Sequence, residues 1–280
     1  MFDAYYNGFF AKRDDIRIPL TDRSIFFGDA VYDAAIGRNG KIFMINEHLA
    51  RLFRNAESLN IPIGMSIDEL KDLLFKLVKL SDPCDSDYFL YIQLSRHSET
   101  RTHSYKDTNK SNLLITVNPI TLFPSDKRLK LVSYPDIRYE LCDIKTVNLI
   151  PTVIASKYAD KKGADEAVFV RGGVVTECAH SNIHIIKDEI LYTHPKNSFI
   201  LPGIAREHLL SVCEKEGVKY REIAFTPEEM MNADQVLVTS SSKICLVAES
   251  FDGAYYGEKS KDLTLRILSR MRNDYYCEMG

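Results

Sequence analysis

The sequence predicts an α+β fold in two domains, and three patterns support this prediction. With 280 residues, of which 45% are hydrophobic, the chain is long enough to bury more than one core. Apolar residues recur at helical spacing in the first half, next to β-rich segments. The second half contains strand pairs joined by short turns, which favours α+β over a doubly wound parallel sheet.

The domain boundary is expected in residues 118–127, NPITLFPSDK. Two prolines and a polar cluster there separate an apolar strand at 113–117 from the next strand at 129–134. The expected parts are an N-terminal domain at 1–118, an interdomain linker at 119–127 and a C-terminal domain at 128–280.

Two helices and a strand are expected in the N-terminal domain. Asn46 is the expected N-cap of a helix in residues 44–61. The apolar face of this helix is formed by Leu49, Leu52, Phe53, Ala56 and Leu59. Residues 66–80 begin with the capping box Ser66-x-x-Glu69 and predict a second helix. Residues 88–95, YFLYIQLS, are β-rich and predict a strand.

Turn signals predict two hairpins in the C-terminal domain. Residues 166–177 should form a hairpin that turns at Gly172-Gly173. Residues 181–194 should form another, which turns at Lys187-Asp188.

Cap signals predict two helices in the same domain. One should begin at about Gly203 and end before Gly217, a residue suited to the left-handed position after a helix. The other has a capping box that starts at Thr226, with Pro227 at the first helical position.

Composition excludes several classes of partner. The chain has 36 basic and 39 acidic residues and a pI near 6.2, so no basic field favours nucleic acid or an anionic membrane. The N-terminus lacks a signal-peptide pattern, and no window of about 18 apolar residues predicts a membrane span. Six cysteines without CxxC pairs indicate reduced thiols in the cytoplasm: Cys84, Cys142, Cys178, Cys213, Cys245 and Cys277.

The stretch VVTECAHSNIHII, residues 174–186, holds a Glu, a Cys and two His within eight positions. A metal site would need His180 and His184 on one helical face, but the β-branched flanks favour strands. At strand spacing, four residues span roughly 13 Å, too far for one zinc ion. A structural histidine is therefore the better interpretation of His184, and we expect no metal.

Two other interpretations of this stretch concern its nucleophile and its acid. Cys178 could act as a thiol nucleophile with His180 as base, but the sequence marks neither an oxyanion hole nor an orienting carboxylate. Glu177 ends a strand in an apolar setting, where a carboxylate needs a cationic or protonated partner. A protonated pyridine nitrogen would be such a partner, and a salt bridge to a nearby arginine is the alternative.

A resemblance to a known family connects these residues. The pattern that carries it is Glu177-x-Ala179-x-x-Asn182-Ile183, then Leu191-x-Thr193, then Leu201-x-Gly203-Ile204-x-Arg206. It resembles the signature of the class IV pyridoxal-phosphate aminotransferases, which include branched-chain aminotransferases, D-amino-acid transaminases and aminodeoxychorismate lyases. Segments similar to the family recur in the same order over nearly the whole chain: DRSIFFGDAVYDAA, INEHLARL, DIRYELCDIKTVNLI and VLVTSSSKI.

The resemblance implies a two-domain fold-type IV enzyme, with pyridoxal 5'-phosphate in the cleft between the domains, packed as a homodimer. It implies that Lys145, in the C-terminal domain, forms the Schiff base with the cofactor aldehyde and moves the proton. The flanking Ile144 and Val147 favour burial of that amine. Glu177 would accept a hydrogen bond from the protonated pyridine nitrogen.

The phosphate and substrate sites follow from the same resemblance. It implies that the phosphate is held by the guanidinium of Arg51, the backbone N–H groups of Ile204 and Ala205, and the hydroxyls of Ser240 and Ser241. It implies that the substrate α-carboxylate is held by Tyr32, Arg101 and His103. From the residues alone, Lys145, Arg51 and Arg101 are also compatible with solvent-exposed charges.

The motif Arg101-x-His103 resembles the carboxylate trap of D-amino-acid transaminases, which lies on a loop that reaches the partner's active site. The expected function is therefore amino transfer between a D-amino acid, such as D-alanine, and a 2-oxo acid. Two alternatives share the cofactor: a branched-chain L-amino-acid aminotransferase and an aminodeoxychorismate lyase. A regulatory protein that binds the cofactor without turnover is a further alternative, and the joint presence of Lys145, Glu177 and Arg51 argues against it.

Four features depart from the family pattern. His184 stands where an aromatic residue is usual, and Asp33 stands where a glutamate commonly follows the tyrosine, which should alter the polar network near Lys145. Ala205 replaces a hydroxyl residue that is common in D-amino-acid transaminases, so one phosphate contact should be lost. A run of serines is replaced by residues 178–180, CAH.

Overall fold

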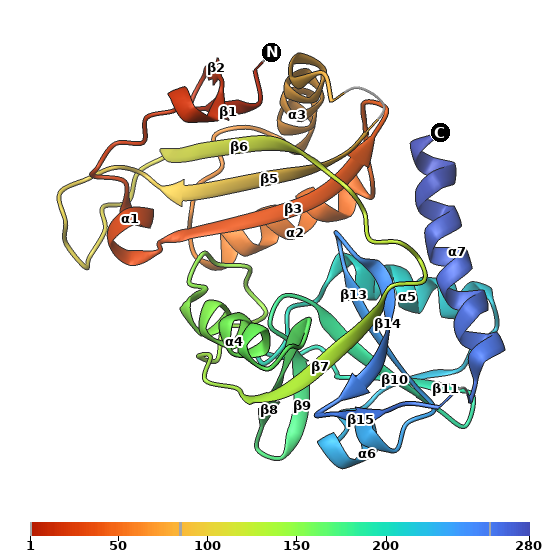
Figure 1. Ribbon diagram of the computed structural model, residues 1–280. Helices are drawn as coiled ribbons and strands as arrows, with labels where there is room; N and C mark the ends of the chain where they lie inside the picture. Colours follow the sequence, from red (N-terminus) through yellow and green to blue (C-terminus); the bar gives the residue numbers. More distant parts are fainter. Residues whose placement is uncertain (1, 84–85, 258) are drawn as a thin grey trace. The chain divides into compact units, whose positions relative to one another are not determined.

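The computed structural model describes residues 2–83, 86–257 and 259–280, and Cys84 lies outside the described residues. Five further cysteines are free thiols: Cys142, Cys178, Cys213, Cys245 and Cys277. Within the described ranges, no helix is both long and apolar enough to cross a membrane. The chain forms two compact units (Figure 1), and each mixes helices and strands, which confirms the α+β prediction.

Unit 1 contains the chain up to Leu122, together with Ile144–Asn148 and Glu278–Gly280. Its six-stranded sheet has the order β2-β1-β6-β5-β3-β4, and the paired strands are antiparallel. The strands are β1 (Ala4–Tyr6), β2 (Phe9–Ala11), β3 (Ala30–Arg38), β4 (Lys41–Ile42), β5 (Asp87–Arg96) and β6 (Ser111–Ile120). The helices are a 3-10 turn (Arg13–Asp15), α1 (Arg23–Phe27), α2 (Ile45–Ser58) and α3 (Ile67–Ser81).

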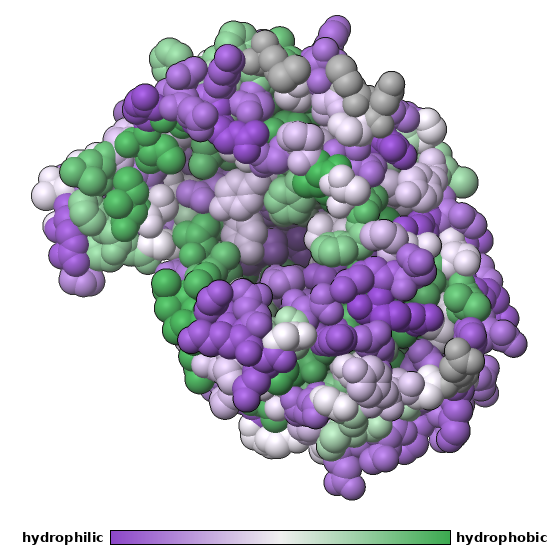
Figure 2. Space-filling view, viewed as in Figure 1, coloured by the Kyte–Doolittle hydropathy of each residue, from purple (hydrophilic) through white to green (hydrophobic). Residues whose placement is uncertain are grey.

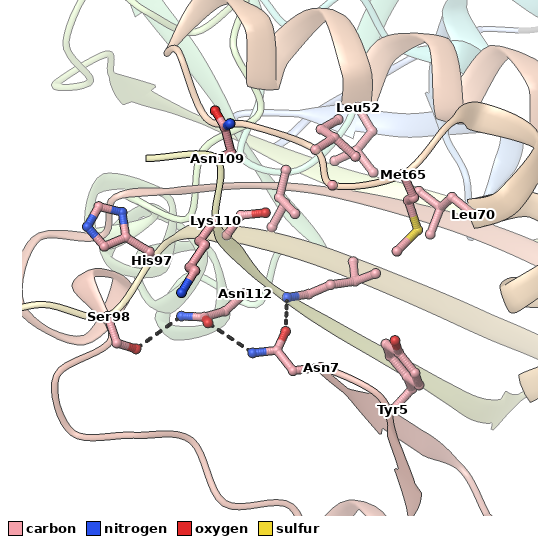
Figure 3. A pocket seen from close by; sticks show the side chains of 15 residues that line it. Tyr5, Asn7, Leu52, Met65, Leu70, His97, Ser98, Asn109, Lys110 and Asn112 are labelled. Atoms are coloured by element: carbon pink, nitrogen blue, oxygen red, sulfur yellow. Dashed lines mark hydrogen bonds between the residues drawn. The ribbon is translucent and has the colours of Figure 1, made fainter. Parts of the chain in front are cut away.

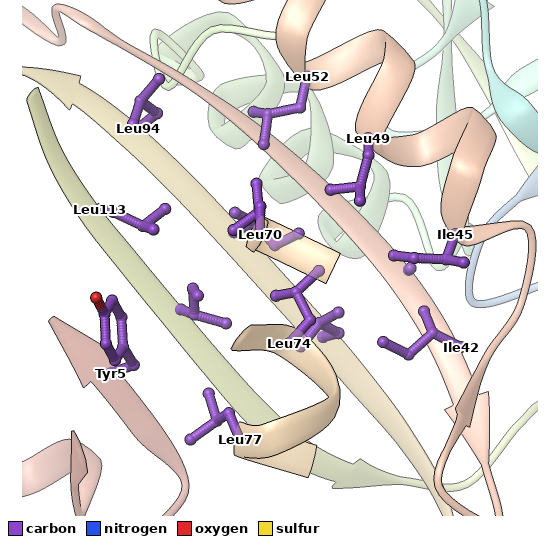
Figure 4. Packing of buried hydrophobic residues seen from close by; sticks show 14 of the residues in the cluster. Tyr5, Ile42, Ile45, Leu49, Leu52, Leu70, Leu74, Leu77, Leu94 and Leu113 are labelled. Atoms are coloured by element: carbon purple, nitrogen blue, oxygen red, sulfur yellow. The ribbon is translucent and has the colours of Figure 1, made fainter. Parts of the chain in front are cut away.

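The core of unit 1 forms where α2 and α3 pack on the sheet. Figure 4 shows Leu49 of α2 and Leu74 of α3 among the side chains of the strands, and both are fully buried. Burial of one leucine side chain stabilises the fold by about 2 kcal/mol, so this apolar stripe explains why both helices dock here. On α2, Leu52 and Ala56 are also buried, as the helical periodicity predicts.

The two helix starts differ in how well the sequence predicts them. The capping box of α3 is present, with Ser66 and Glu69 bonded reciprocally. The predicted N-cap of α2 is wrong, because the helix begins after Met44, which adopts a left-handed conformation at φ 50°. Asn46 lies in the first turn, where its side chain accepts a hydrogen bond of 2.8 Å from Lys71 Nζ instead.

Unit 2 contains Phe123–Asp143 and Leu149–Cys277. Its sheet has the order β12-β11-β10-β13-β14-β7-β8-β9, with β15 beside β14. The strands are β7 (Arg128–Pro135), β8 (Glu166–Arg171), β9 (Val174–Cys178), β10 (Asn182–Lys187), β11 (Ile190–Thr193), β12 (Tyr220–Glu222), β13 (Gln235–Ser240), β14 (Ile244–Phe251) and β15 (Ala254–Tyr255). The helices are α4 (Ile150–Lys161), α5 (Ile204–Lys215), α6 (Pro227–Met231) and α7 (Lys261–Met279), whose last residues belong to unit 1.

The predicted hairpins and caps of unit 2 are present. β8 and β9 are antiparallel, and Gly172 and Gly173 between them both have positive φ. The second hairpin joins β10 to β11, but it turns at Asp188-Glu189, one residue later than expected, where both residues have positive φ. Gly217, at φ 68°, follows α5, and the capping box of α6 starts at Thr226.

The units divide the chain differently from the expected domains. The chain leaves unit 1 after Leu122, inside the expected linker, but β6 already includes the first linker residues up to Ile120. The segment Ile144–Asn148, which contains Lys145, belongs to unit 1 and not to the C-terminal part. The reason is a return of the chain to β3, where Thr146 forms a bridge with Val31.

Candidate active site

Lys145 lies beside Tyr32 in unit 1. The amide of Tyr32 donates to the carbonyl of Lys145 at 2.9 Å, so the returning segment is bonded directly to β3. The Nζ atom of Lys145 lies 4.4 Å from the centre of the Tyr32 ring, which in turn packs on Tyr91 at 5.4 Å. The structure therefore brings together two of the predicted site residues, an amine and a phenol.

Arg51 is buried in unit 1 and is not a surface charge. Its Nε and Nη2 atoms donate to the two oxygens of Asp33 at 2.8 and 2.9 Å. Nδ1 of His48 lies 2.6 Å from the same carboxylate. Burial opposes ionisation of Asp33, but the charges of Arg51 and His48 outweigh it and hold its pKa well below the usual range. The carboxylate of Asp33 thus fixes the guanidinium of Arg51.

Glu177 ends β9 in unit 2 and is almost fully buried. Arg138 Nη1 donates to its Oε1 atom, so the salt bridge considered from the sequence is present. Oε2 accepts hydrogen bonds from Asn182 Nδ2 at 2.9 Å and from the Leu201 amide at 3.1 Å. The carboxylate is therefore held in one orientation at the strand end, as an anion.

Arg138 is a site residue that the sequence reasoning missed. Its guanidinium also binds both oxygens of Asp136 at 2.9 Å and lies 4.4 Å from the Phe169 ring centre. A signal was present, because Glu177 needs a cation and Arg138 is the one arginine in DIRYELCDIKTVNLI, a segment that carries the family resemblance.

Asn182 is a second residue that positions Glu177. Its Nδ2 atom bonds both to Glu177 and to the carbonyl of Leu201 at 2.9 Å. A Cβ atom on Gly203 would lie 2.1 Å from Asn182 Oδ1, so a larger residue here would displace the Asn182 side chain or the start of α5. The family-like motif Asn182…Gly203 therefore has a steric explanation in this chain.

The predicted phosphate ligands of unit 2 lie at the start of helix α5 and at the end of strand β13. Ile204 and Ala205 are the first residues of α5, where main-chain N–H groups have no partner within the helix. Ser240 ends β13, and its Oγ atom accepts a hydrogen bond of 3.2 Å from the Lys243 amide, which shapes the turn that includes Ser241. α5 contacts β13 within the unit. Amides at a helix start and hydroxyls in a tight turn suit an anion.

A buried ion pair follows this turn and was not predicted. Lys243 Nζ lies 3.2 Å from Glu166 Oε2 and 3.1 Å from Ser181 Oγ. Glu166 Oε1 in turn accepts from the His180 amide at 2.8 Å. These contacts order residues 178–180, the segment that departs from the family pattern.

Arg101 and His103 lie in the segment between β5 and β6 of unit 1. The Arg101 guanidinium is 5.3 Å from the Phe27 ring centre, and the His103 ring is 5.4 Å from the same ring. Neither side chain has a hydrogen bond or ion pair to another described residue. The structure thus brings the two together as polar groups able to bind an anion.

The other interpretations of residues 174–186 can be judged from the same structure. His184 is fully buried, with Nδ1 2.9 Å from Thr193 Oγ1 and Nε2 2.9 Å from Thr239 Oγ1, which confirms a structural histidine. Burial also lowers its pKa to about 3. Burial raises the pKa of Cys178 well above its ordinary value, which disfavours a thiolate nucleophile.

A model of the family described as amino-transferase class IV matches residues 30–250. The chain belongs to this family. Two class IV relatives are D-alanine aminotransferases. The one from Bacillus licheniformis is 33% identical over 276 residues, which is 98% of this chain and 97% of the relative. The one from Staphylococcus haemolyticus is 33% identical over 278 residues and 98% of both chains.

Solved structures of class IV enzymes share the fold. A branched-chain aminotransferase from Thermoproteus uzoniensis with norvaline has a TM-score of 0.89 at 18% identity, over 97% of this chain and 94% of that chain. A putative 4-amino-4-deoxychorismate lyase from Legionella pneumophila has a TM-score of 0.85 at 24% identity, over 94% and 97%. At these identities the likeness concerns the fold, which is the fold-type IV architecture expected from the sequence.

As a class IV aminotransferase, the protein distributes its predicted site residues over both units. Unit 1 supplies an amine, a buried guanidinium and the polar pair Arg101 and His103. Unit 2 supplies an oriented carboxylate at Glu177, free helix-start amides and the Ser240 turn.

Proposed function

We propose that this protein is a pyridoxal 5'-phosphate-dependent aminotransferase that moves an amino group between a D-amino acid, such as D-alanine, and a 2-oxo acid. One observation carries the D-selective part. The cation of Arg101 and the imidazole of His103 lie on one aromatic ring without other polar partners in the described chain. Two such donors suit a single α-carboxylate. The D-alanine aminotransferase relatives support the same choice.

The residues present fit the cofactor chemically. The amine of Lys145 would attach the aldehyde, and Glu177, held as an anion, would accept a hydrogen bond from the ring nitrogen. The phosphate would be bound by the amides of Ile204 and Ala205, the hydroxyls of Ser240 and Ser241, and Arg51, whose fork already binds Asp33. When bound, the cofactor supplies an electron sink for the charge that develops at the substrate Cα.

The chain's own residues then have separate tasks. Lys145 takes the proton from Cα of the amino donor as a general base. In the reverse half-reaction it gives a proton to Cα of the acceptor as a general acid. Tyr32, Arg101 and His103 orient the α-carboxylate and thereby decide which face of Cα meets the amine. Because the same grip serves the amino donor and the 2-oxo acceptor, one site performs both half-reactions.

The decisive experiment compares D-alanine with L-leucine as amino donor to 2-oxoglutarate. We expect pyruvate to form from D-alanine at a rate that depends on both substrates. Turnover of L-leucine alone would replace this proposal with a branched-chain L-aminotransferase. Pyruvate release from aminodeoxychorismate without any 2-oxo acid would indicate a lyase, and cofactor binding without turnover of any donor would indicate a regulatory protein.

We further propose a homodimer located in the cytoplasm. Hydrophobic side chains are exposed over α1 and over α4, where Figure 2 shows green surface. In unit 1 they include Ile18, Leu20 and Ile25, and in unit 2 Leu149, Ile150 and Val153. Exposed apolar groups of this kind favour an interface. Light scattering should give about twice the 32.0 kDa of one chain, and a monomer would contradict the proposal.

A further inference from the structure

The segment between β5 and β6, which carries Arg101 and His103, packs against helix α1. The Phe27 ring lies 4.6 Å from the guanidinium carbon of Arg23, 5.3 Å from that of Arg101 and 5.4 Å from the His103 ring. Phe26 adds a second ring at 5.9 Å from Arg101. Both proposed carboxylate ligands therefore share one aromatic surface, which sets the distance between them.

Arg23 binds the main chain of the same segment. Its Nη1 atom donates to the carbonyl of Thr102 at 2.7 Å, and Nη2 donates to that of His103 at 3.3 Å. Nη1 also donates to Glu99 at 3.0 Å. The Arg23 side chain is only 4% exposed, so water competes little for the groups that form these hydrogen bonds. Arg23 thus bonds to the main chain of Thr102 and His103, while Phe27 packs against the side chains of Arg101 and His103.

Arg23 is itself fixed by a shared carboxylate. Asp29 accepts from Arg23 Nε at 2.8 Å and from Arg96 Nε at 2.9 Å. Arg96 then lies 3.6 Å from the ring centre of Tyr105, further along the segment, and donates to the carbonyl of Leu59 at 2.7 Å. Two buried arginines joined by one carboxylate therefore hold the segment at several points.

A cavity lies beside the two ends of the segment. Figure 3 shows His97, Ser98, Asn109 and Lys110 around a cavity of about 520 Å³ whose floor is apolar. Ser98 is bonded there to Asn112 at 3.3 Å. The contacts to α1 therefore add to hydrogen bonds at the ends of the segment, such as that from the Glu99 amide to the Thr21 carbonyl at 3.2 Å.

We propose that Phe27 and Arg23 are positioning residues of the substrate-carboxylate site, and that they act by holding Arg101 and His103 ready to bind. This inference rests on the proposed function, in which those two residues grip the α-carboxylate. A long arginine on a polar loop loses rotamer freedom when it binds an anion, and prior packing on a ring reduces that loss. The benefit is the same for amino acids and 2-oxo acids, since both present the same carboxylate.

The test uses the full-length holoenzyme with Phe27→Leu, Arg23→Lys and Arg101→Ala, and the exposed Arg17→Lys as the matched control. Phe27→Leu and Arg23→Lys should raise KM for both D-alanine and 2-oxoglutarate about three- to tenfold, with kcat within about twofold. Arg101→Ala should raise KM further, and adding Phe27→Leu to it should raise KM by a smaller factor than Phe27→Leu does in the wild type, because only His103 is then left to position. Arg17→Lys should leave KM unchanged.

A second readout is independent of turnover. Hydrogen exchange of the main-chain amides in residues 99–105 should be faster in Arg23→Lys and Phe27→Leu than in the wild type, and unchanged in Arg17→Lys. Unchanged exchange, or an unchanged KM in these variants when Arg101→Ala does raise KM, would overturn the positioning role. An unchanged KM in Arg101→Ala, with faster exchange in the other two, would instead remove the carboxylate grip from the proposed function.

Discussion

Arg138 Nη1 donates to Glu177 Oε1, and the same guanidinium binds both oxygens of Asp136, so one cation serves two buried carboxylates in unit 2. Glu177 thereby keeps its charge without solvent, while its second oxygen remains bonded to Asn182. The carboxylate of Glu177, at the end of β9, is therefore already oriented before any ligand binds.

Replacement of Arg138 by methionine should therefore destabilise the fold. It would leave Asp136 and Glu177 buried without their cation, and the free energy of unfolding should fall by about 3 kcal/mol. Urea unfolding at pH 7 measures this change. Arg266→Met is the control, because the Arg266 side chain is 54% exposed and its Nε lies 3.9 Å from Glu216 Oε2, where loss of a pair has little effect. Equal changes in the two variants would contradict the prediction.

Asp136 makes stability depend on pH. Burial raises its pKa, but hydrogen bonds from Arg138 and Arg171 outweigh burial and lower the pKa to about 2. An unfolded aspartate has a pKa of about 3.9, so a stabilisation of roughly 2 kcal/mol is present above about pH 4 and is lost as the pH falls through about 2. The stability difference between wild type and Asp136→Asn should shrink over this range, and a constant difference would argue against it.

Gly203→Ala should disturb Glu177 through Asn182. The added methyl would lie 2.1 Å from Asn182 Oδ1, so either the side chain or the start of α5 must move, at a cost of about 1 to 3 kcal/mol. Thermal unfolding measures the loss. Gly257→Ala is the matched control, since no atom of the other described residues lies within 4 Å of its Cβ position. A stability like that of the control would show that Asn182 can yield freely.

Lys145→Ala should abolish covalent attachment of the cofactor. After incubation with pyridoxal 5'-phosphate and borohydride, intact-mass measurement should find the adduct in the wild type and in Lys157→Ala, whose side chain is 68% exposed. It should find no adduct in Lys145→Ala, because we expect a stable imine to form only with the amine that lies at the cofactor site. A persistent adduct would assign the attachment to another lysine.

Ala205→Ser should strengthen cofactor binding. A hydroxyl at the second position of α5 would restore a phosphate contact that the sequence suggests is lost, which should lower the cofactor Kd about two- to tenfold. Equilibrium dialysis measures Kd, with the exposed Ala254→Ser as control. An unchanged Kd would place the phosphate away from this turn of α5.

Much of the fold could be predicted because its signals are local. The capping boxes of α3 and α6 and the turn at Gly172-Gly173 each depend on neighbouring residues, and the structure contains all three. The prediction of the α2 N-cap was wrong for a local reason as well. Met44 adopts a left-handed conformation, which is uncommon for a residue other than glycine and is not indicated by a methionine side chain.

The site was less accessible to prediction, because its partners meet through tertiary structure. Glu177 and Arg138 are joined only when β7, β8 and β9 align in one sheet. The binding of Arg51 to Asp33 likewise depends on how α2 docks on β3. The family resemblance named Lys145, Glu177 and Arg51, but the residues that hold them become visible only in the folded chain.

The return of Ile144–Asn148 to β3 has a consequence for biosynthesis. A ribosome that has finished β6 has not yet made Ile144–Asn148, the segment that bonds to Tyr32, and Glu278–Gly280, which also belong to unit 1, are made later still. A fragment cut at the unit boundary would therefore be an incomplete body rather than an autonomous one. In nascent chains, unit 1 should accordingly reach protease resistance only after Glu278–Gly280 have been made, when every piece of the first unit is available.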